Sequence, residues 1–196
     1  MSKKDKNFVF GNRIPRDYFV AMGCGQIDKG SGRDPWETGS YDLALLDAGI
    51  ENFNIVEYTS VLPPESREIC IDDAKRWFRH GAVLETIMAS VNGHLGERLC
   101  AGVGTIQVRR KSDGKHIGGF AAEYEGYADE KTAKKILKDS LRGIVERRNK
   151  SLGDDDQLIP FDEKTHVKDF FVEENYGTVL VAICFVNYIY PLLEEA

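Results

Sequence analysis

Strand-like runs joined by short turns make up most of this chain, and only one segment has the pattern of a long helix. That segment, Ala128–Lys150, has Asp129 as its expected cap and basic residues at its end. Its apolar face at helical spacing consists of Ala133, Ile136, Leu137, Leu141, Ile144 and Val145. Because there is little βαβ alternation, the order of elements predicts an α/β protein with antiparallel or mixed sheets. A chain of 196 residues is long enough for one domain with its own core.

Turn and cap signals divide the rest of the chain. A short helical pattern over Tyr41–Ala48 has Ser40 as its expected N-cap and ends at Gly49. The residues before it, 26–39, are rich in glycine and predict a loop. An Asp-Gly pair at 113–114 predicts a hairpin between the strands on either side of it.

The last two strand-like runs are Thr165–Glu173 and Thr178–Tyr190. We expect them to pair as an antiparallel hairpin, because runs that are neighbours in sequence and separated by a short turn usually pair. The second run is almost wholly apolar, which is typical of a strand that is central in its sheet or covered on both faces.

A further strand-like run, Phe53–Thr59, ends abruptly at Ser60, and the Pro63-Pro64 pair interrupts the chain three residues later. A hydroxyl group where a strand meets a sharp turn can attack the carbonyl carbon before it, here that of Thr59. The resulting ester would break by elimination and leave dehydroalanine, which loses ammonia to become a pyruvoyl group. Taken alone, a Thr-Ser pair is more typical of a solvated turn without any chemistry.

Three separated motifs carry a resemblance to a known family. They are Tyr41–Ile50 (YDLALLDAGI), Asn52–Pro64 (NFNIVEYTSVLPP) and Gly118–Gly126 (GGFAAEYEG). In this order they resemble the pyruvoyl-dependent arginine decarboxylases, and within that family the bacterial branch, which is cleaved between threonine and serine. The resemblance extends from about residue 17 to about residue 190, which is nearly the whole chain.

The resemblance implies an αββα sandwich, a trimer as the basic unit and active sites between subunits. It also implies that the single domain, 1–196, is cleaved between Thr59 and Ser60 into residues 1–59 and 60–196. The covalent pyruvoyl group would derive from Ser60. The implied reaction converts L-arginine to agmatine and carbon dioxide. Since each turnover consumes a proton, acid resistance or polyamine supply is the implied role.

Decarboxylation of an amino acid needs an electron sink that side chains do not supply. A pyruvoyl group would be that sink in place of PLP, because Gly102–Gly104 is too short for a phosphate-binding loop. The resemblance assigns the proton donor to Glu123, which shares a strand face with Glu125 while Tyr124 points away. Apolar surroundings would raise the pKa of Glu123. The alternative is that both glutamates are solvated carboxylates on a strand.

The resemblance also assigns residues to substrate binding. Asp42 matches the acidic residue near the arginine side chain, and a carboxylate can pair bidentately with a guanidinium group. Without the resemblance, an aspartate in the first turn of a helix would only complement the helix dipole. Leu43 and Leu46 would line the pocket or else pack in the core. Asn54 would orient groups near the cofactor or else bond to backbone at the start of its strand.

Composition argues against several other classes of function for this chain. A net charge of −6, from 32 acidic and 26 basic residues, argues against a nucleic-acid partner. No apolar stretch is long enough for a membrane span, and no apolar segment follows the basic N-terminus as in a secretory signal. The four cysteines have no metal-ligand spacing, so no metal site is expected. Cys24, Cys100 and Cys184 are expected to be buried, reduced thiols of a cytoplasmic protein.

Two other functions stay open from the sequence. In the first, the enzyme decarboxylates another basic or aromatic amino acid. In the second, the chain is an unprocessed homologue that serves as a binding or regulatory subunit. Retention of both Ser60 and Glu123 argues against the second, since such a subunit needs neither. A Ser-His-Asp hydrolase is disfavoured because the G-x-S-x-G motif is missing from the sequence.

Overall fold

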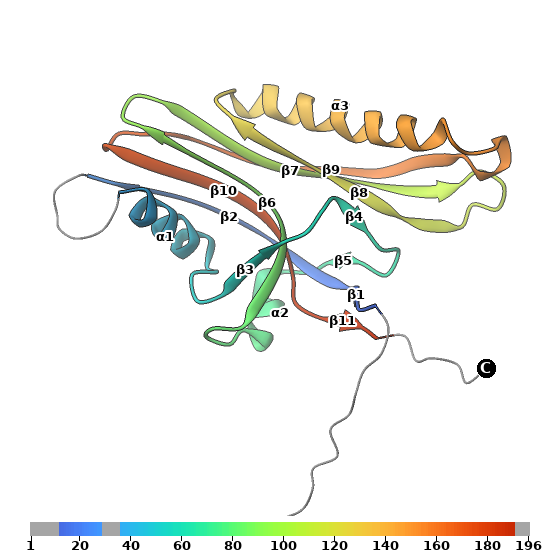
Figure 1. Ribbon diagram of the computed structural model, residues 1–196, viewed down its shortest axis with the longest axis horizontal. Helices are drawn as coiled ribbons and strands as arrows, with labels where there is room; N and C mark the ends of the chain where they lie inside the picture. Colours follow the sequence, from blue (N-terminus) through green and yellow to red (C-terminus); the bar gives the residue numbers. More distant parts are fainter. Residues whose placement is uncertain (1–11, 29–35, 191–196) are drawn as a thin grey trace, which may run out of the picture.

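The computed structural model describes residues 12–28 and 36–190, which form four layers (Figure 1). Helix α1 (Trp36–Ala48) covers the outer face of a five-stranded sheet, and helix α3 (Glu130–Asn149) covers the outer face of a four-stranded sheet. The inner faces of the two sheets pack on each other. This is an αββα sandwich, so the predicted fold class is confirmed, with largely antiparallel sheets in one domain.

The five-stranded sheet has the order β3-β6-β10-β2-β5. These strands are β3 (Asn54–Glu57), β6 (Val83–His94), β10 (Tyr176–Phe185), β2 (Asp17–Ile27) and β5 (Arg67–Glu68). Strands β2 and β6 run antiparallel to β10, whereas the short edge strands β3 and β5 run parallel to their neighbours. The apolar sequence of β10 predicted a central, covered strand, and this is confirmed because its residues from Gly177 to Phe185 are all buried.

The four-stranded sheet has the order β4-β8-β7-β9 and is antiparallel throughout. These strands are β4 (Val61–Leu62), β8 (His116–Gly126), β7 (Arg98–Arg110) and β9 (Leu158–Phe171). The predicted hairpin joins β7 to β8, with Gly114 at φ 68°. The remaining elements are β1 (Ile14–Pro15), β11 (Tyr188–Ile189), α2 (Ile71–Ala74) and the 3-10 turns Lys75–Trp77 and Asp154–Asp156.

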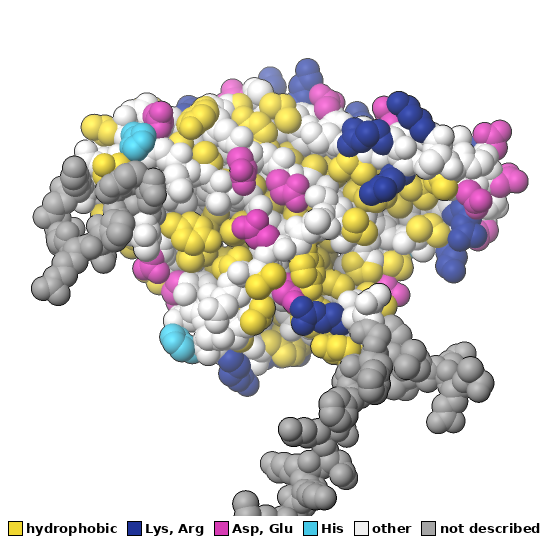
Figure 2. Space-filling model, viewed as in Figure 1, with side chains coloured by type: hydrophobic (Ala, Val, Ile, Leu, Met, Phe, Trp, Pro, Cys, Tyr) yellow, Lys and Arg dark blue, Asp and Glu magenta, His cyan; other side chains and the backbone are white. Residues whose placement is uncertain are grey.

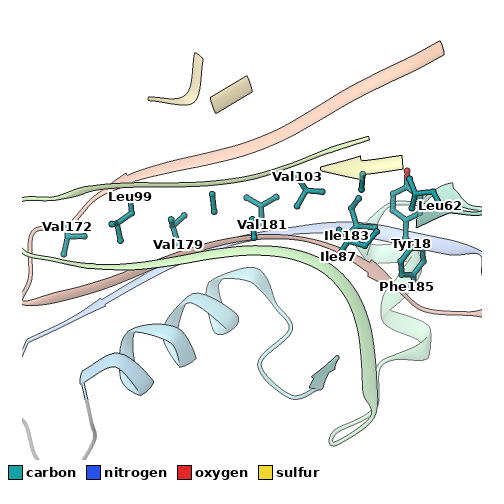
Figure 3. Packing of buried hydrophobic residues seen from close by; sticks show 13 residues of the cluster. Tyr18, Leu62, Ile87, Leu99, Val103, Val172, Val179, Val181, Ile183 and Phe185 are labelled. Carbon is teal, nitrogen blue, oxygen red and sulfur yellow. The ribbon is translucent and has the colours of Figure 1, made fainter. Parts of the chain in front are cut away.

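Alternation along β10 supplies two cores at once. Val179 and Val181 point between the sheets and meet Leu99 and Val103 of β7 (Figure 3). The alternate residues of β10, Leu180, Ala182 and Cys184, face α1 on the other side. A strand that is apolar on both faces therefore joins the two middle layers to the outer helix.

Helix α3 follows its predicted pattern closely. The Asp129 side chain accepts a hydrogen bond from the Thr132 N–H at 2.7 Å, which is the predicted N-cap. The buried residues on the face toward the sheet are Ala133, Leu137, Leu141 and Val145. Ile136, which the pattern placed on that face, is 39% exposed, because the contact with the sheet is narrower than the apolar stripe.

The predicted start of α1 is wrong, and its predicted end is confirmed. Ser40 is not the N-cap, because the helix already begins at Trp36. Ser40 is instead fully buried, with its Oγ 2.8 Å from the Thr178 hydroxyl on β10. The helix ends at Gly49, which has φ 72°. Residues 29–35 of the predicted loop lie outside the described residues.

The predicted hairpin of the last two runs is also wrong. Strand β9 pairs with β7 in the four-stranded sheet, whereas β10 pairs with β2 and β6 in the five-stranded sheet. The short link between them crosses from one sheet to the other, and its Val172 is fully buried in the inter-sheet core. The physical reason is burial: β9 is only half-buried and suits a sheet edge, whereas β10 needs a partner strand on both sides.

All four cysteines are free thiols. Cys100 and Cys184 are fully buried, as predicted, whereas Cys24 is half-buried and Cys70 is exposed. Burial raises the pKa of the Cys100 thiol to about 11 and also raises the pKa of Cys184. The two buried cysteines are therefore poor nucleophiles and act as small apolar residues.

Helix α1 lies so close to β2 that Gly23 has no room for a side chain. A Cβ atom on Gly23 would lie 2.0 Å from the carbonyl oxygen of Ala44. We expect Gly23→Ala to lower the free energy of unfolding by about 1–3 kcal/mol or more, because the helix must shift off the sheet. Urea denaturation measures the change. The control is Gly153→Ala, whose Cβ would meet nothing within 4 Å, and equal stability of the two variants would contradict this packing.

Candidate active site

The chain crosses from one sheet to the other at Thr59 and Ser60. Edge strand β3 ends just before this pair, and edge strand β4 begins just after it. The Tyr58 N–H donates to the Thr86 carbonyl on β6 at 2.6 Å, and the Ala121 N–H on β8 donates to the Ser60 carbonyl at 3.0 Å. The peptide bond between Thr59 and Ser60 is therefore held on both sides, with one anchor on each sheet.

A tight turn is centred on Ser60. The Val61 N–H donates to the Thr59 carbonyl oxygen at 3.1 Å, the three-residue pattern of a γ-turn. The Ser60 hydroxyl donates to the Glu123 carboxylate, with Oγ 3.1 Å from Oε1 and 3.3 Å from Oε2. The turn thus brings together a hydroxyl group, a carboxylate in contact with it and a carbonyl group that accepts a hydrogen bond, which are the groups that a nucleophilic attack on this carbonyl would need.

Glu123 lies on β8 and faces the side of the sheet that Ser60 occupies. Glu125 shares this face, as strand alternation predicts, and accepts a hydrogen bond from the Ser90 N–H at 2.9 Å. Tyr124 points the other way and packs under α3. Part of Glu123 remains exposed, but burial removes enough water to raise the pKa of its carboxyl group. The Ser60 hydrogen bond opposes this rise, and the charges of Glu125 and Glu57 add to it.

The three residues assigned to substrate binding on α1 lie on its outer, exposed face. Asp42 is in the second turn of the helix, not the first, so the helix dipole no longer accounts for it. Leu43 and Leu46 are 37% and 56% exposed, so neither packs in the core of this chain. Within the part of the chain that the structure describes, no hydrogen bond or ion pair joins this group to Ser60.

Asn54 lies at the start of β3. Its side-chain amide donates to the Gly81 carbonyl at 2.8 Å, and its N–H donates to the Ala82 carbonyl at 2.8 Å. This is the backbone-bonding role, one of the two roles that the sequence left open. Six residues of extended chain, up to about 20 Å, separate Asn54 from Ser60. Within one chain, Asn54 therefore supports the geometry of β3 and does not contact the Ser60–Glu123 pair.

A cavity that the sequence did not predict lies beside the peptide bond between Thr59 and Ser60. It has a volume of about 540 Å³ and is lined by Thr59, Ser60 and Phe120, and by Arg147 and Arg148 of α3. From the sequence, the two arginines only suited the C-terminal dipole of the helix. No motif reveals the cavity, because it depends on how α3 packs over the edge of the sheet.

Two further cavities in the described residues contain neither Ser60 nor Glu123. A second cavity, of about 480 Å³, lies between α3 and β9 and contains neither Ser60 nor Glu123. Among residues 12–28 and 36–190, no group of His, Cys, Asp and Glu side chains is arranged to hold a metal ion. No helix in these two ranges is both long and apolar enough to cross a membrane.

The fold and the Ser60–Glu123 pair define an αββα protein in which a serine hydroxyl contacts a carboxylate where the edges of the two sheets meet. A family model described as pyruvoyl-dependent arginine decarboxylase matches residues 18–190. The chain belongs to this family, as its three motifs predicted.

Relatives with the same description cover most of the chain. The pyruvoyl-dependent arginine decarboxylase of Chlamydia muridarum is 38% identical in an alignment of 192 positions that covers 91% of this chain and 94% of the relative. That of Chlamydia abortus is 36% identical over 193 residues, with the same coverage. Pyruvoyl-dependent arginine decarboxylase 2 of Archaeoglobus fulgidus is 29% identical in an alignment of 133 positions that covers 66% of this chain and 78% of the relative. The chlamydial sequences therefore match more of this chain than the archaeal sequence does.

Proposed function

We propose that this chain is a self-processing decarboxylase that converts L-arginine to agmatine and carbon dioxide. The observation that carries the proposal is the contact between the Ser60 hydroxyl and Glu123, beside a Thr59 carbonyl that accepts a hydrogen bond from Val61. Family membership, and the names of the chlamydial relatives, support the substrate and the reaction.

Self-processing follows from the groups around Ser60. Glu123 takes the hydroxyl proton as the serine oxygen bonds to the carbonyl carbon of Thr59. The Val61 N–H stabilises the negative charge that develops on the Thr59 carbonyl oxygen. The amide C–N bond then breaks and leaves an ester. Loss of the Ser60 Hα expels Thr59 as a carboxylate and leaves dehydroalanine. Its imine form adds water and releases ammonia, which leaves a pyruvoyl group on residues 60–196.

The residues around position 60 fit a pyruvoyl group, because it is built from Ser60 and needs no separate binding loop. The Ala121 N–H already binds the carbonyl group of residue 60 and would keep it in place. When present, the group supplies the electron sink that decarboxylation requires. Glu123 supplies the proton for the substrate Cα, and its raised pKa keeps that proton bound to higher pH than in an ordinary glutamate.

Substrate recognition in this proposal involves a second copy of the chain. Asp42 would bind the guanidinium group, and Leu43 and Leu46 would line the apolar part of the pocket. These side chains are exposed on α1, and within one chain they do not contact the Ser60–Glu123 pair. Two incomplete half-sites on one chain support an assembly in which neighbouring copies complete each other, and the trimer implied by the resemblance is such an assembly.

The proposed cellular setting follows from the chemistry. The free thiols suit the reducing cytoplasm. Each turnover consumes one proton and yields an amine, so the reaction would serve acid resistance or polyamine supply.

The intact mass of freshly purified protein tests the proposed function. We expect two fragments, residues 1–59 and 60–196, and a larger fragment without a free amino terminus. An unbroken chain of 196 residues that still decarboxylates arginine would contradict the proposal.

Replacing Asp42 tests the assigned substrate pocket. We expect Asp42→Asn to lower kcat/KM for arginine by at least about 30-fold, because losing one partner of a desolvated charge pair costs on the order of 2–5 kcal/mol. Steady-state kinetics of fully processed enzyme measure the effect. The control is Asp139→Asn, an exposed aspartate on α3. Unchanged arginine turnover in Asp42→Asn would show that the carboxylate does not bind the guanidinium group.

A further inference from the structure

The cavity beside the scissile bond opens on the α3 side of the four-stranded sheet. Phe120, which lines it, packs with the residues under α3. Three residues further along β8, Glu123 points to the opposite side, where it binds Ser60. The peptide bond between Thr59 and Ser60 therefore lies between two different environments, one on each side of the sheet edge.

The two environments have opposite charge. Glu123 has two acidic neighbours, Glu57 and Glu125, whose charges act on it. On the cavity side, Arg147 and Arg148 contribute two guanidinium groups. In the face of the molecule shown in Figure 2, acidic side chains gather near the middle, and basic side chains lie over the C-terminal half of α3.

The two arginines have no acidic partner in the described ranges. Arg142, one turn earlier on α3, pairs with Glu163 at 3.2 Å. Neither Arg147 nor Arg148 forms such an ion pair, and the Arg148 guanidinium lies 5.7 Å from the centre of the Phe120 ring. Both lie in the last turn of the helix, where they complement its dipole. That role does not require a cavity that reaches the scissile bond.

We propose that this cavity binds the new carboxylate of Thr59 after cleavage, through Arg147 and Arg148. The inference rests on the proposed self-processing, which converts an uncharged amide at Thr59 into a chain-terminal carboxylate. That group has an ordinary pKa of about 3.5 and is negatively charged at neutral pH. It is repelled by the carboxylates around Glu123 and attracted to guanidinium groups that can bind it bidentately.

Binding of the Thr59 carboxylate in the cavity has a consequence for catalysis. The acidic side of the site must accept a cationic substrate, and an extra carboxylate left beside Ser60 would occupy that space. Binding of Thr59 on the opposite side clears the Glu123 side. It also holds the end of residues 1–59 on the larger fragment, which carries both arginines.

Digestion with a carboxypeptidase tests where the new terminus lies. We expect Thr59 to be removed slowly from processed wild-type protein and at least about tenfold faster from the variant carrying Arg147→Gln and Arg148→Gln, because an unbound terminus is accessible. The mass of the smaller fragment measures the loss. Lys135→Gln removes one charge from an exposed position of the same helix and should behave as wild type. Equal rates in all proteins would overturn the proposal.

A second measurement separates carboxylate binding from a purely structural role. The two substitutions are made singly and together in the processed protein and in Ser60→Ala, which has no new terminus. We expect the substitutions to lower Tm more in the processed protein than in Ser60→Ala. An equal fall in both would mean that the arginines only stabilise the helix, and it would overturn the proposal. If wild-type protein has no fragment of residues 1–59, the proposed function fails instead, and the same mass spectrum shows it.

Discussion

Replacing Ser60 by alanine should leave the chain as one polypeptide of 196 residues without arginine decarboxylase activity. In the proposed mechanism, the hydroxyl that contacts Glu123 at 3.1 Å is the nucleophile and the source of the pyruvoyl group, so its loss should remove both processing and the electron sink. Because enzymes accelerate such reactions by about 10⁶-fold or more, the remaining activity should lie below detection. Intact mass and release of labelled carbon dioxide from arginine measure the two effects.

The neighbouring hydroxyl provides the matched control. The proposed attack uses the backbone carbonyl of Thr59 and not its side chain, so Thr59→Ala should still yield two fragments. Ser60→Ala should remain folded, since the backbone bond between the Ser60 carbonyl and the Ala121 N–H does not depend on the hydroxyl. A cleaved and active Ser60→Ala protein would exclude Ser60 as the source of the cofactor.

The local structure could be predicted where it depends on residues close in sequence. The cap at Asp129, the stop at Gly49 and the hairpin at 113–114 all form within a few residues of their signals. The partner of β9 could not be predicted in this way. A short link is compatible with a hairpin or with a crossing between sheets, and the choice depends on burial in the whole sandwich.

The candidate site could likewise be predicted only in part. Family resemblance selected Ser60 and Glu123, 63 positions apart, and the structure brings them into hydrogen-bond contact. The Val61 N–H could not be identified beforehand, because a backbone donor has no signature in the sequence. The arginine-lined cavity depends on the position of α3 over a sheet edge, which no spacing of residues encodes. The substrate-binding role of Asp42 still rests on the family resemblance, because within one chain Asp42 does not contact the Ser60–Glu123 pair.

Glu123 has two opposite roles in the proposed mechanism, so replacing it should affect both self-processing and decarboxylation. As a base it must be ionised to take the proton of Ser60, and as a proton donor it must be protonated. Glu123→Gln keeps the shape but can do neither. We expect Glu123→Gln to slow self-processing by about 10²–10⁴-fold. In processed protein, we expect it to lower kcat for decarboxylation by about the same factor. Activity is expressed per processed chain, so that lost processing is not counted as lost catalysis.

The pH dependences of self-processing and of decarboxylation distinguish the two roles of Glu123. Burial and the charges of Glu125 and Glu57 raise the pKa of Glu123, so the protonated form persists to higher pH than in an ordinary glutamate. As the pH rises through this pKa, decarboxylation should slow and self-processing should accelerate. Glu125→Gln is the control on the same strand face: it removes one negative neighbour and should move both transitions to lower pH without abolishing either reaction. Identical pH profiles of wild type and Glu123→Gln would assign the proton transfers to another group.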